Sequence, residues 1–149
     1  MNAAAGLILL DTSIVVHLAR NKAAGRHIAS DLSLSARPEA PLICQVTVGE
    51  ALSLGRKLGW GGEKLSRLHA LLRELVVVSL EQPGVIQQYV EVDDFCRRQG
   101  RSLSQNDLWI AAAACAANAM LVTTDKDFDP LHGHLLQRRF YNQQELTDE

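Results

Sequence analysis

Short runs of hydrophobic residues alternate along the chain with longer segments of helical spacing. Residues 7–10 are a continuous apolar run of the length expected for a buried parallel strand, and residues 42–46 predict the next strand. The β-branched run 76–80 predicts a further buried strand, and residues 119–123 predict a fourth. Residues 139–141 are typical of a short strand at the edge of a sheet.

Helical patterns fill the stretches between these runs. We expect helices over residues 14–20, 23–35, 48–58, 63–74, 83 or 84 to 98, and 107–118. Thr47 and Glu50 have the spacing of a capping box, which predicts a helix that starts at Val48. Ser104 is expected to cap the last helix. This helix carries almost no polar side chain after Asp107, so we expect it to be buried on most sides.

The alternation of strands and helices predicts the fold class. Parallel strands joined through helices form a sheet that is covered on both faces. We therefore expect an α/β protein, a three-layer α/β/α sandwich around a mostly parallel sheet of four to five strands. No repeat or linker divides the 149 residues, so we expect a single domain over 1–149.

Composition and charge narrow the function classes only slightly. Hydrophobic residues make up 47% of the chain and charged residues 21%, close to a soluble globular average. The net charge of −2 carries no global signal of nucleic-acid binding. Local basic groups remain candidates for it or for solvated helix faces: Arg20, Lys22 and Arg26; Arg97, Arg98 and Arg101; Arg138 and Arg139.

Cysteine usage and apolar run length indicate a cytoplasmic protein without a membrane span. The three cysteines, Cys44, Cys96 and Cys115, have no metal-binding spacing, and we expect buried thiols in a reducing compartment. The longest strictly apolar run, 108–117, is well short of a membrane span, and the first residues do not resemble a signal peptide.

Four carboxylates occupy corresponding places in the predicted fold. Asp11 and Asp125 follow the first and fourth strands, while Glu50 and Asp107 lie in the predicted first turns of helices. The carboxyl ends of parallel strands and the helix starts that follow them share one edge of a sheet. We therefore expect all four acids to converge there.

An all-oxygen cluster of this kind favours a hard divalent cation, Mg²⁺ or Mn²⁺, over zinc. Each acid alone also has an ordinary structural role. Asp11 can cap a helix, Glu50 can complete a capping box, Asp107 suits a helix N-terminus, and Asp125 suits a turn. Their joint placement is what favours a metal site.

Four motifs resemble the PIN-domain family. They are residues 9–13 (LLDTS), 48–51 (VGEA), 106–112 (NDLWIAA) and 121–128 (LVTTDKDF). Each motif is short, but their order and spacing are similar to the family along essentially the whole chain. The compact form most resembles the toxin half of toxin–antitoxin pairs of the VapC type.

The resemblance implies a set of site residues. Asp11, Glu50, Asp107 and Asp125 match the family's acidic catalytic and metal-binding quartet, Glu50 binding directly or through water. Asp127, and with less weight Asp129, are further acids near the last motif. The resemblance and the local sequence also suggest that Ser13, Asn106 and Thr123 orient the carboxylates or waters.

The resemblance also implies an activity and partners. The expected activity is metal-dependent endoribonuclease cleavage of transfer or ribosomal RNA that leaves a 5′-phosphate and a 3′-hydroxyl. The expected partners are a second copy of the chain and an antitoxin that inserts a basic side chain among the acids. A PIN-like RNA-binding or protein-interaction module without catalysis is the main alternative.

Other residues and enzyme classes are weaker candidates. His132 and His134 lack a fixed metal-ligand geometry, and His17 is interpreted as structural. Trp109 is expected to pack in the core, whereas Trp60 is expected to be more exposed, where it could stack a base or form a dimer contact. Ser13 stands where a haloacid-dehalogenase phosphatase has its second Asp. A receiver domain's paired acids and lysine are not evident, and the phosphate-binding glycine motifs are absent.

Overall fold

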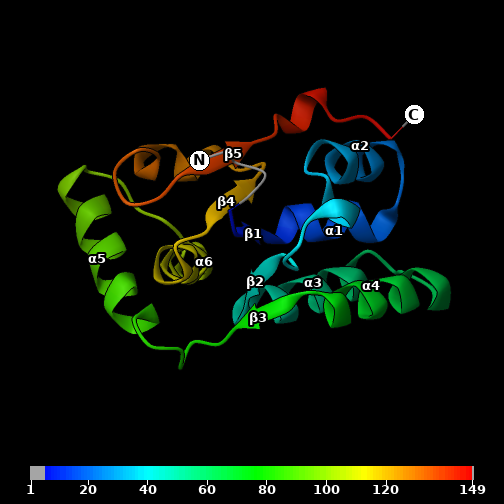
Figure 1. The fold of residues 1–149 in the computed structure, drawn as a ribbon, viewed down its shortest axis with the longest axis horizontal. Coiled ribbons are helices and arrows are strands. Elements are labelled where there is room, and N and C mark those ends of the chain that lie inside the picture. Colours follow the sequence, from blue (N-terminus) through cyan, green and yellow to red (C-terminus); the bar gives the residue numbers. More distant parts are fainter. Residues whose placement is uncertain (1–5, 149) are drawn as a thin grey trace.

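A five-stranded, entirely parallel sheet forms the centre of the molecule (Figure 1), as seen in a computed structural model that describes residues 6–148. The strands are β1 Ile8–Leu10, β2 Leu42–Cys44, β3 Val76–Val78, β4 Met120–Thr123 and β5 Arg138–Phe140. Their order across the sheet is β3-β2-β1-β4-β5, and each neighbouring pair runs parallel. The predicted α/β/α fold is confirmed, with β5 as the expected short edge strand.

Six α-helices cover the two faces of the sheet (Figure 1). They are α1 Thr12–Arg20, α2 Ala23–Asp31, α3 Gln45–Lys57, α4 Gly62–Glu74, α5 Val85–Arg98 and α6 Gln105–Ala117. Apolar residues of α1 to α4 pack in one core and those of α5 and α6 in the other. Short 3-10 helices lie at Leu34–Ala36, Lys126–Leu131 and Gln143–Glu145.

The central strand β1 supplies both cores because successive side chains of a strand point to opposite faces. Ile8 and Leu10 pack with α1 to α4, and Leu9 packs with α5 and α6. All three side chains are at most 1% exposed. This explains why residues 7–10 read as one continuous apolar run.

Two predicted helix boundaries were wrong. The helix predicted from Val48 begins three residues earlier, at Gln45, directly after β2. Thr47 is therefore inside α3 and does not cap it, and Glu50 lies beyond the first turn. The second predicted helix ends at Asp31, and a turn with Ser33 in the left-handed conformation separates it from the following 3-10 helix.

The prediction of a buried strand at residues 76–80 was also wrong. β3 spans only Val76–Val78 and lies at an edge of the sheet, with Val76 51% and Val77 41% exposed. An edge strand has a neighbour on one side only, so its β-branched side chains are not covered as those of β1 are. The apolar run correctly predicted a strand but not its place in the sheet.

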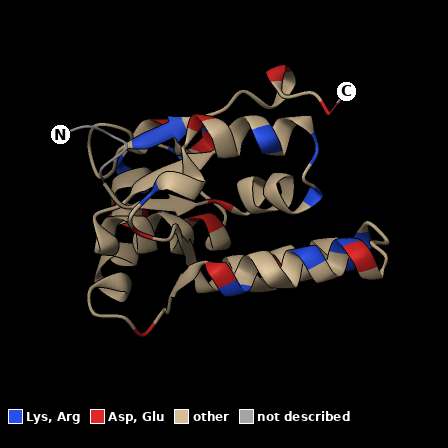
Figure 2. Ribbon diagram, turned by 45° about the vertical axis from the view of Figure 1, so that its right-hand side comes forward, with Lys and Arg blue, Asp and Glu red and all other residues tan. Residues whose placement is uncertain are grey.

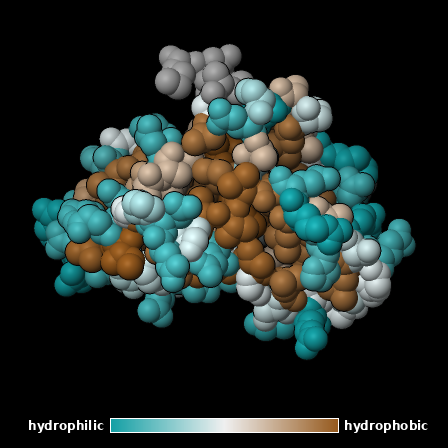
Figure 3. Space-filling model, turned by 60° about the horizontal axis from the view of Figure 1, so that its bottom comes forward, coloured by the Kyte–Doolittle hydropathy of each residue, from teal (hydrophilic) through white to brown (hydrophobic). Residues whose placement is uncertain are grey.

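Charged residues of both signs are spread over the molecule (Figure 2), in keeping with the small net charge of −2. Apolar residues are distributed less evenly over the surface. Figure 3 shows hydrophobic side chains gathered in the middle of one face. None of the described helices is long and apolar enough to cross a membrane. Cys44 and Cys96 are buried as expected, whereas Cys115 is only partly buried.

Candidate functional site

Asp11 stands at the carboxyl end of the central strand. β1 pairs with β4 so that Leu10 lies opposite Val122, and the residues that follow, Asp11 and Thr123, therefore meet. The Thr123 hydroxyl donates a hydrogen bond of 2.6 Å to Asp11 Oδ2, and the Thr12 backbone N–H donates one of 2.8 Å to Oδ1. Burial raises the pKa of Asp11, although these two hydrogen bonds act in the opposite direction.

Asp125 follows the neighbouring strand β4 and starts the 3-10 helix Lys126–Leu131. Its Oδ1 accepts a 2.8 Å hydrogen bond from the Asp127 backbone N–H, and its own N–H donates to the Thr123 hydroxyl at 2.9 Å. Thr123 thus connects Asp11 and Asp125. The turn also places a third carboxylate, that of Asp127, close to Asp125.

Glu50 reaches the site from the second turn of α3. The Thr12 hydroxyl donates to Glu50 Oε1 at 2.7 Å, and the Asn106 amide donates to Oε2 at 3.0 Å. The Thr12 hydroxyl also lies 3.2 Å from that of the buried Thr47. The capping-box interpretation of Glu50 is excluded, because both its oxygens are held by side chains of other elements.

Asp107 comes from the first turn of α6, as predicted. Ser104 caps this helix and accepts a 3.2 Å hydrogen bond from the Asp107 backbone N–H. Burial, together with the negative charges of Asp11 and Asp125, raises the pKa of Asp107 to about 6. The repulsion from neighbouring carboxylates thus adds to the effect of burial at Asp107.

The four predicted acids line one pocket of about 350 Å³ at the carboxyl edge of the sheet. Carboxylate oxygens of Asp107, Asp125 and Asp127 lie within 4.8 Å of one another. The donors in this group are all carboxylate oxygens, the ligand type that Mg²⁺ and Mn²⁺ prefer. The residues present therefore fit a hard divalent cation.

Sequence reasoning missed several residues of this pocket. Thr12, Lys126 and Gln143 line it together with the acids. Thr12 could have been suspected, since it follows Asp11 at the same strand end. Gln143 had no sequence signal, because it belongs to a 3-10 helix far along the chain that folds back to the sheet edge.

The other predicted polar residues divide into two groups. Ser13 lines the pocket, and its hydroxyl accepts a 2.9 Å hydrogen bond from the Thr124 hydroxyl and contacts no carboxylate through a described hydrogen bond. Asp129 instead forms an ion pair of 2.9 Å with Arg138. It lies outside the group of mutually close carboxylates.

The three candidate histidines form contacts that do not involve the carboxylates of the site. His132 Nδ1 accepts a hydrogen bond from the Arg138 backbone, and the His134 ring packs against Phe95. His17 is buried, and its Nε2 is 3.2 Å from Gln143 Oε1, whereas its Nδ1 has no partner among the described residues.

Trp60 was expected to be exposed, and this was wrong, because only 9% of its surface is accessible. It packs in the core with Leu68, close to Gly55. Trp109 does pack in the core as predicted, with its ring 4.1 Å from that of Tyr89.

Two of the three basic groups are neutralised in large part by neighbouring acids. Arg97 and Arg98 pair with Asp93 and Asp94 one turn earlier on α5. Arg138 pairs with Asp129 as described above, and Arg139 pairs with Asp31 at 2.6 Å. Among the described residues, the group of Arg20, Lys22 and Arg26 forms no ion pair.

Similar proteins of known structure share this fold. A chain of the VapBC2 structure from Rickettsia felis, bound to a promoter DNA fragment, superposes with a TM-score of 0.75 at 22% identity, over 91% of this chain and 99% of that one. A chain of VapBC-1 from nontypeable Haemophilus influenzae gives 0.71 at 24% identity, over 90% and 97%.

Sequence comparison identifies the family. Ribonuclease VapC1 of Haemophilus influenzae (strain R2866) is 29% identical over 117 residues, which are 78% of this chain and 85% of that protein. The family model of the PIN domain matches residues 8–132, most of the chain and all four acidic positions. The chain belongs to the PIN-domain family.

Proposed function

We propose that this protein is a metal-dependent endoribonuclease that acts as the toxin of a toxin–antitoxin pair. The observation that carries the proposal is the convergence of Asp11, Glu50, Asp107 and Asp125 in one pocket, from elements more than a hundred residues apart. Gathering four carboxylates costs free energy through repulsion and desolvation, as the raised pKa of Asp107 reflects. A bound divalent cation would remove that cost.

The relatives support the same activity and a protein partner. The similar protein from Haemophilus influenzae is named a ribonuclease, and the structural neighbours are VapBC toxin–antitoxin complexes. We infer that this chain cleaves RNA, with transfer or ribosomal RNA as the substrate class, and that an antitoxin silences it. The pocket suits inhibition by a basic side chain, which would pair with the acids in place of the metal.

We infer that Asp107, Asp125 and Asp127 hold Mg²⁺ or Mn²⁺, with Asp11 and Glu50 completing the site directly or through water. The three Asp residues already offer oxygens within 4.8 Å of one another. A cation bound there would neutralise negative charge at the phosphodiester and would lower the pKa of a nearby water. A PIN-like module without catalysis would not need this cluster.

The chain's own residues orient the carboxylates. Thr123 and the Thr12 backbone fix both oxygens of Asp11, so that its side chain cannot rotate away from the pocket. Thr12 and Asn106 hold the two oxygens of Glu50 in the same way. We infer that Glu50, held in this orientation, accepts a proton from an attacking water that enters the pocket.

A cleavage assay on the purified chain, free of any antitoxin, tests the proposal. Bulk transfer and ribosomal RNA are incubated with Mg²⁺, Mn²⁺ or EDTA, and RNA ends are mapped. Wild type and Asp129→Asn should cut in the presence of metal, whereas Asp107→Asn should not, because Asp129 is engaged with Arg138 outside the cluster. If folded wild type cuts none of these RNAs with either metal, the nuclease proposal fails and the non-catalytic module takes its place.

A further inference from the structure

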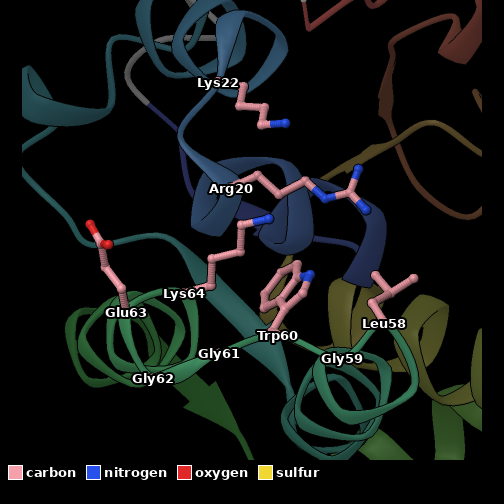
Figure 4. A pocket seen from close by; sticks show the side chains of 9 residues that line it. All are labelled: Arg20, Lys22, Leu58, Gly59, Trp60, Gly61, Gly62, Glu63 and Lys64. Atoms are coloured by element: carbon pink, nitrogen blue, oxygen red, sulfur yellow. The ribbon is translucent and has the colours of Figure 1, made fainter.

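A second pocket lies at the C-terminal ends of α1 and α3, whereas Thr12 and Glu50 near their N-terminal ends line the acidic site. It has a volume of about 550 Å³ and lies between the connection from α1 to α2 and the connection from α3 to α4 (Figure 4). Arg20 and Lys22 contribute from one side, and Trp60 and Lys64 from the other. We call these four residues and the space between them the basic pocket.

The charge of the basic pocket is not neutralised within the described part of the chain. Arg20, Lys22 and Lys64 form no ion pair with a described acid. Glu63 also lines the pocket, but its carboxylate points away from Trp60 and Arg20 in Figure 4. Three cations facing one cavity repel one another unless an anion enters.

Trp60 forms a rigid wall of the basic pocket. Its ring is anchored in the core, and the Arg20 guanidinium and the Lys64 ammonium each lie 6.0 Å from the ring centre. Cations over an aromatic face are held without being neutralised. The indole N–H forms no hydrogen bond with the described residues and adds a neutral donor. The pocket thus combines three cations with a rigid wall, as an anion site requires.

A further hollow extends from the acidic site toward the basic pocket. It has a volume of about 610 Å³ and is lined by Thr12, Glu50, Ser53, Leu54, Lys57 and Asn106. This hollow begins at the acidic site, with which it shares Thr12 and Glu50, and follows α3 to Lys57. The next residue in the sequence, Leu58, lies at the edge of the basic pocket. Along α1, eight residues separate Thr12 from Arg20, or about 12 Å at 1.5 Å per residue.

We propose that the basic pocket binds a backbone phosphate of the RNA substrate, away from the bond that is cut. Because consecutive phosphates of a nucleic-acid strand are several ångströms apart, a separation of about 12 Å along α1 places the bound phosphate more than one nucleotide from the bond that is cut. The acids cannot hold a polyanion by themselves, and the basic pocket supplies the attraction that the net charge of −2 lacks. The proposal deepens the proposed ribonuclease function and rests on it.

RNA binding in the absence of cleavage tests this site. We would measure the fluorescence anisotropy of a fluorescein-labelled single-stranded RNA of about 16 nucleotides as protein is added in EDTA. The variant combines Arg20→Gln, Lys22→Gln and Lys64→Gln. We expect its affinity to fall on the order of tenfold, and the slope of log affinity against log salt to lose about two units, because three contacts at about 0.7 each are removed. With cleavable RNA, KM should rise while kcat stays near the wild-type value.

A control of equal charge combines Arg73→Gln, Arg97→Gln and Arg101→Gln, which line none of the three hollows described here. It should change affinity less than twofold. Equal losses in both triple variants would overturn the proposal, since the effect would then be one of net charge. Circular dichroism of both variants verifies folding, and Arg20→Lys should retain RNA affinity.

A polyglutamate peptide of similar length separates RNA from an acidic protein segment as the occupant. If the basic-pocket variant loses affinity for the peptide but not for RNA, the pocket serves a protein partner and the proposal is wrong. Failure of the ribonuclease function gives a different result, namely no cleavage by wild type in the metal assay. The binding comparison in EDTA is independent of that outcome.

Discussion

Asp107 is partly buried beside the carboxylates of Asp11 and Asp125, and its burial and their charges raise its pKa. Its pKa is raised to about 6, whereas its ordinary value is 3.8. The folded protein therefore binds more protons than the unfolded chain between about pH 4 and pH 6, and the free energy of unfolding falls as the pH rises through this range. Above about pH 6, the charged Asp107 destabilises the metal-free fold.

Asp107→Asn should consequently stabilise the metal-free protein while abolishing cleavage. At pH 8 in EDTA we expect a gain on the order of 1–2 kcal/mol in the free energy of unfolding, reduced from the full shift because Asp107 is partly exposed. The gain should vanish toward pH 3, below both pKa values, where wild-type Asp107 is largely protonated in the folded and in the unfolded state. Urea unfolding at the two pH values measures it, and equal stability of wild type and variant at pH 8 would contradict the assignment.

Added Mg²⁺ or Mn²⁺ should make the wild type more stable than Asp107→Asn. The cation binds the folded wild type and neutralises the carboxylates, so the wild-type melting temperature should rise with metal concentration. Asp107→Asn should gain much less. Lowering the pH below about 6 should weaken the metal effect on wild type, because protonated Asp107 is a poor ligand. Thermal unfolding at pH 5 and pH 8, with and without metal, measures both effects.

Thr12 positions Glu50 and was not recognised from sequence. Thr12→Val removes the 2.7 Å hydrogen bond to Glu50 Oε1 and should lower kcat about tenfold or more, with a smaller change in KM. Thr12→Ser keeps the hydroxyl and should restore most of the rate. Thr47→Val is the matched control, since Thr47 contacts the Thr12 hydroxyl and has no described hydrogen bond to Glu50. Wild-type kcat in Thr12→Val would exclude this positioning role.

Helices α1 and α2 approach so closely that one position of α2, where the two helices touch, must be glycine. A Cβ added at Gly25 would overlap the backbone carbonyl of His17 on α1. Gly25→Ala should therefore lower the free energy of unfolding by about 2 kcal/mol or more. Gly49→Ala, inside α3 with nothing within 4 Å of the added Cβ, should raise it by about 0.5–1 kcal/mol. Urea unfolding of both variants tests the contact, and similar effects would disprove it.

The start of α3 illustrates why a local pattern failed. Thr47 and Glu50 have capping-box spacing, yet the chain enters the helix directly from Cys44, whose backbone is extended. The Thr47 side chain is buried and points to Thr12, a partner 35 residues away. The hydrogen bond to that partner is a tertiary contact, and local spacing cannot distinguish it from a capping bond.

The exposed apolar surface leads to a prediction about assembly. Ile86 and Val90 of α5 are 62% and 52% exposed, and Val76 of β3 is 51% exposed. We expect a homodimer that covers part of this surface, because burying apolar area stabilises association by about 25 cal/mol per Å². Sedimentation equilibrium should show a dimer whose dissociation constant rises at least tenfold in Ile86→Lys. Gln87→Lys places the same charge on the same helix and should have a smaller effect, whereas monomeric wild type would contradict the expectation.

The order of elements, the parallel sheet and the convergence of the acids could be derived from the chain itself. Apolar runs of strand length mark the buried strands, and an acid after two of them must reach the same sheet edge, because parallel strands end together. Asp11 and Asp125 are of this kind, and Ser104 marks the start of α6 equally plainly. These features rest on short-range patterns and on the rule that parallel strands share an edge.

Tertiary structure alone decided what depends on neighbours distant in sequence. It placed β3 at an edge and exposed its valines, buried Trp60, and turned Gln143 back to the acidic pocket. It also paired Arg138 and Arg139 with acids, whereas Arg20 and Lys22 form no ion pair with a described acid. Exposure, ion pairing and strand order are properties of the packed molecule, because each depends on which surfaces meet, and no local pattern encodes that.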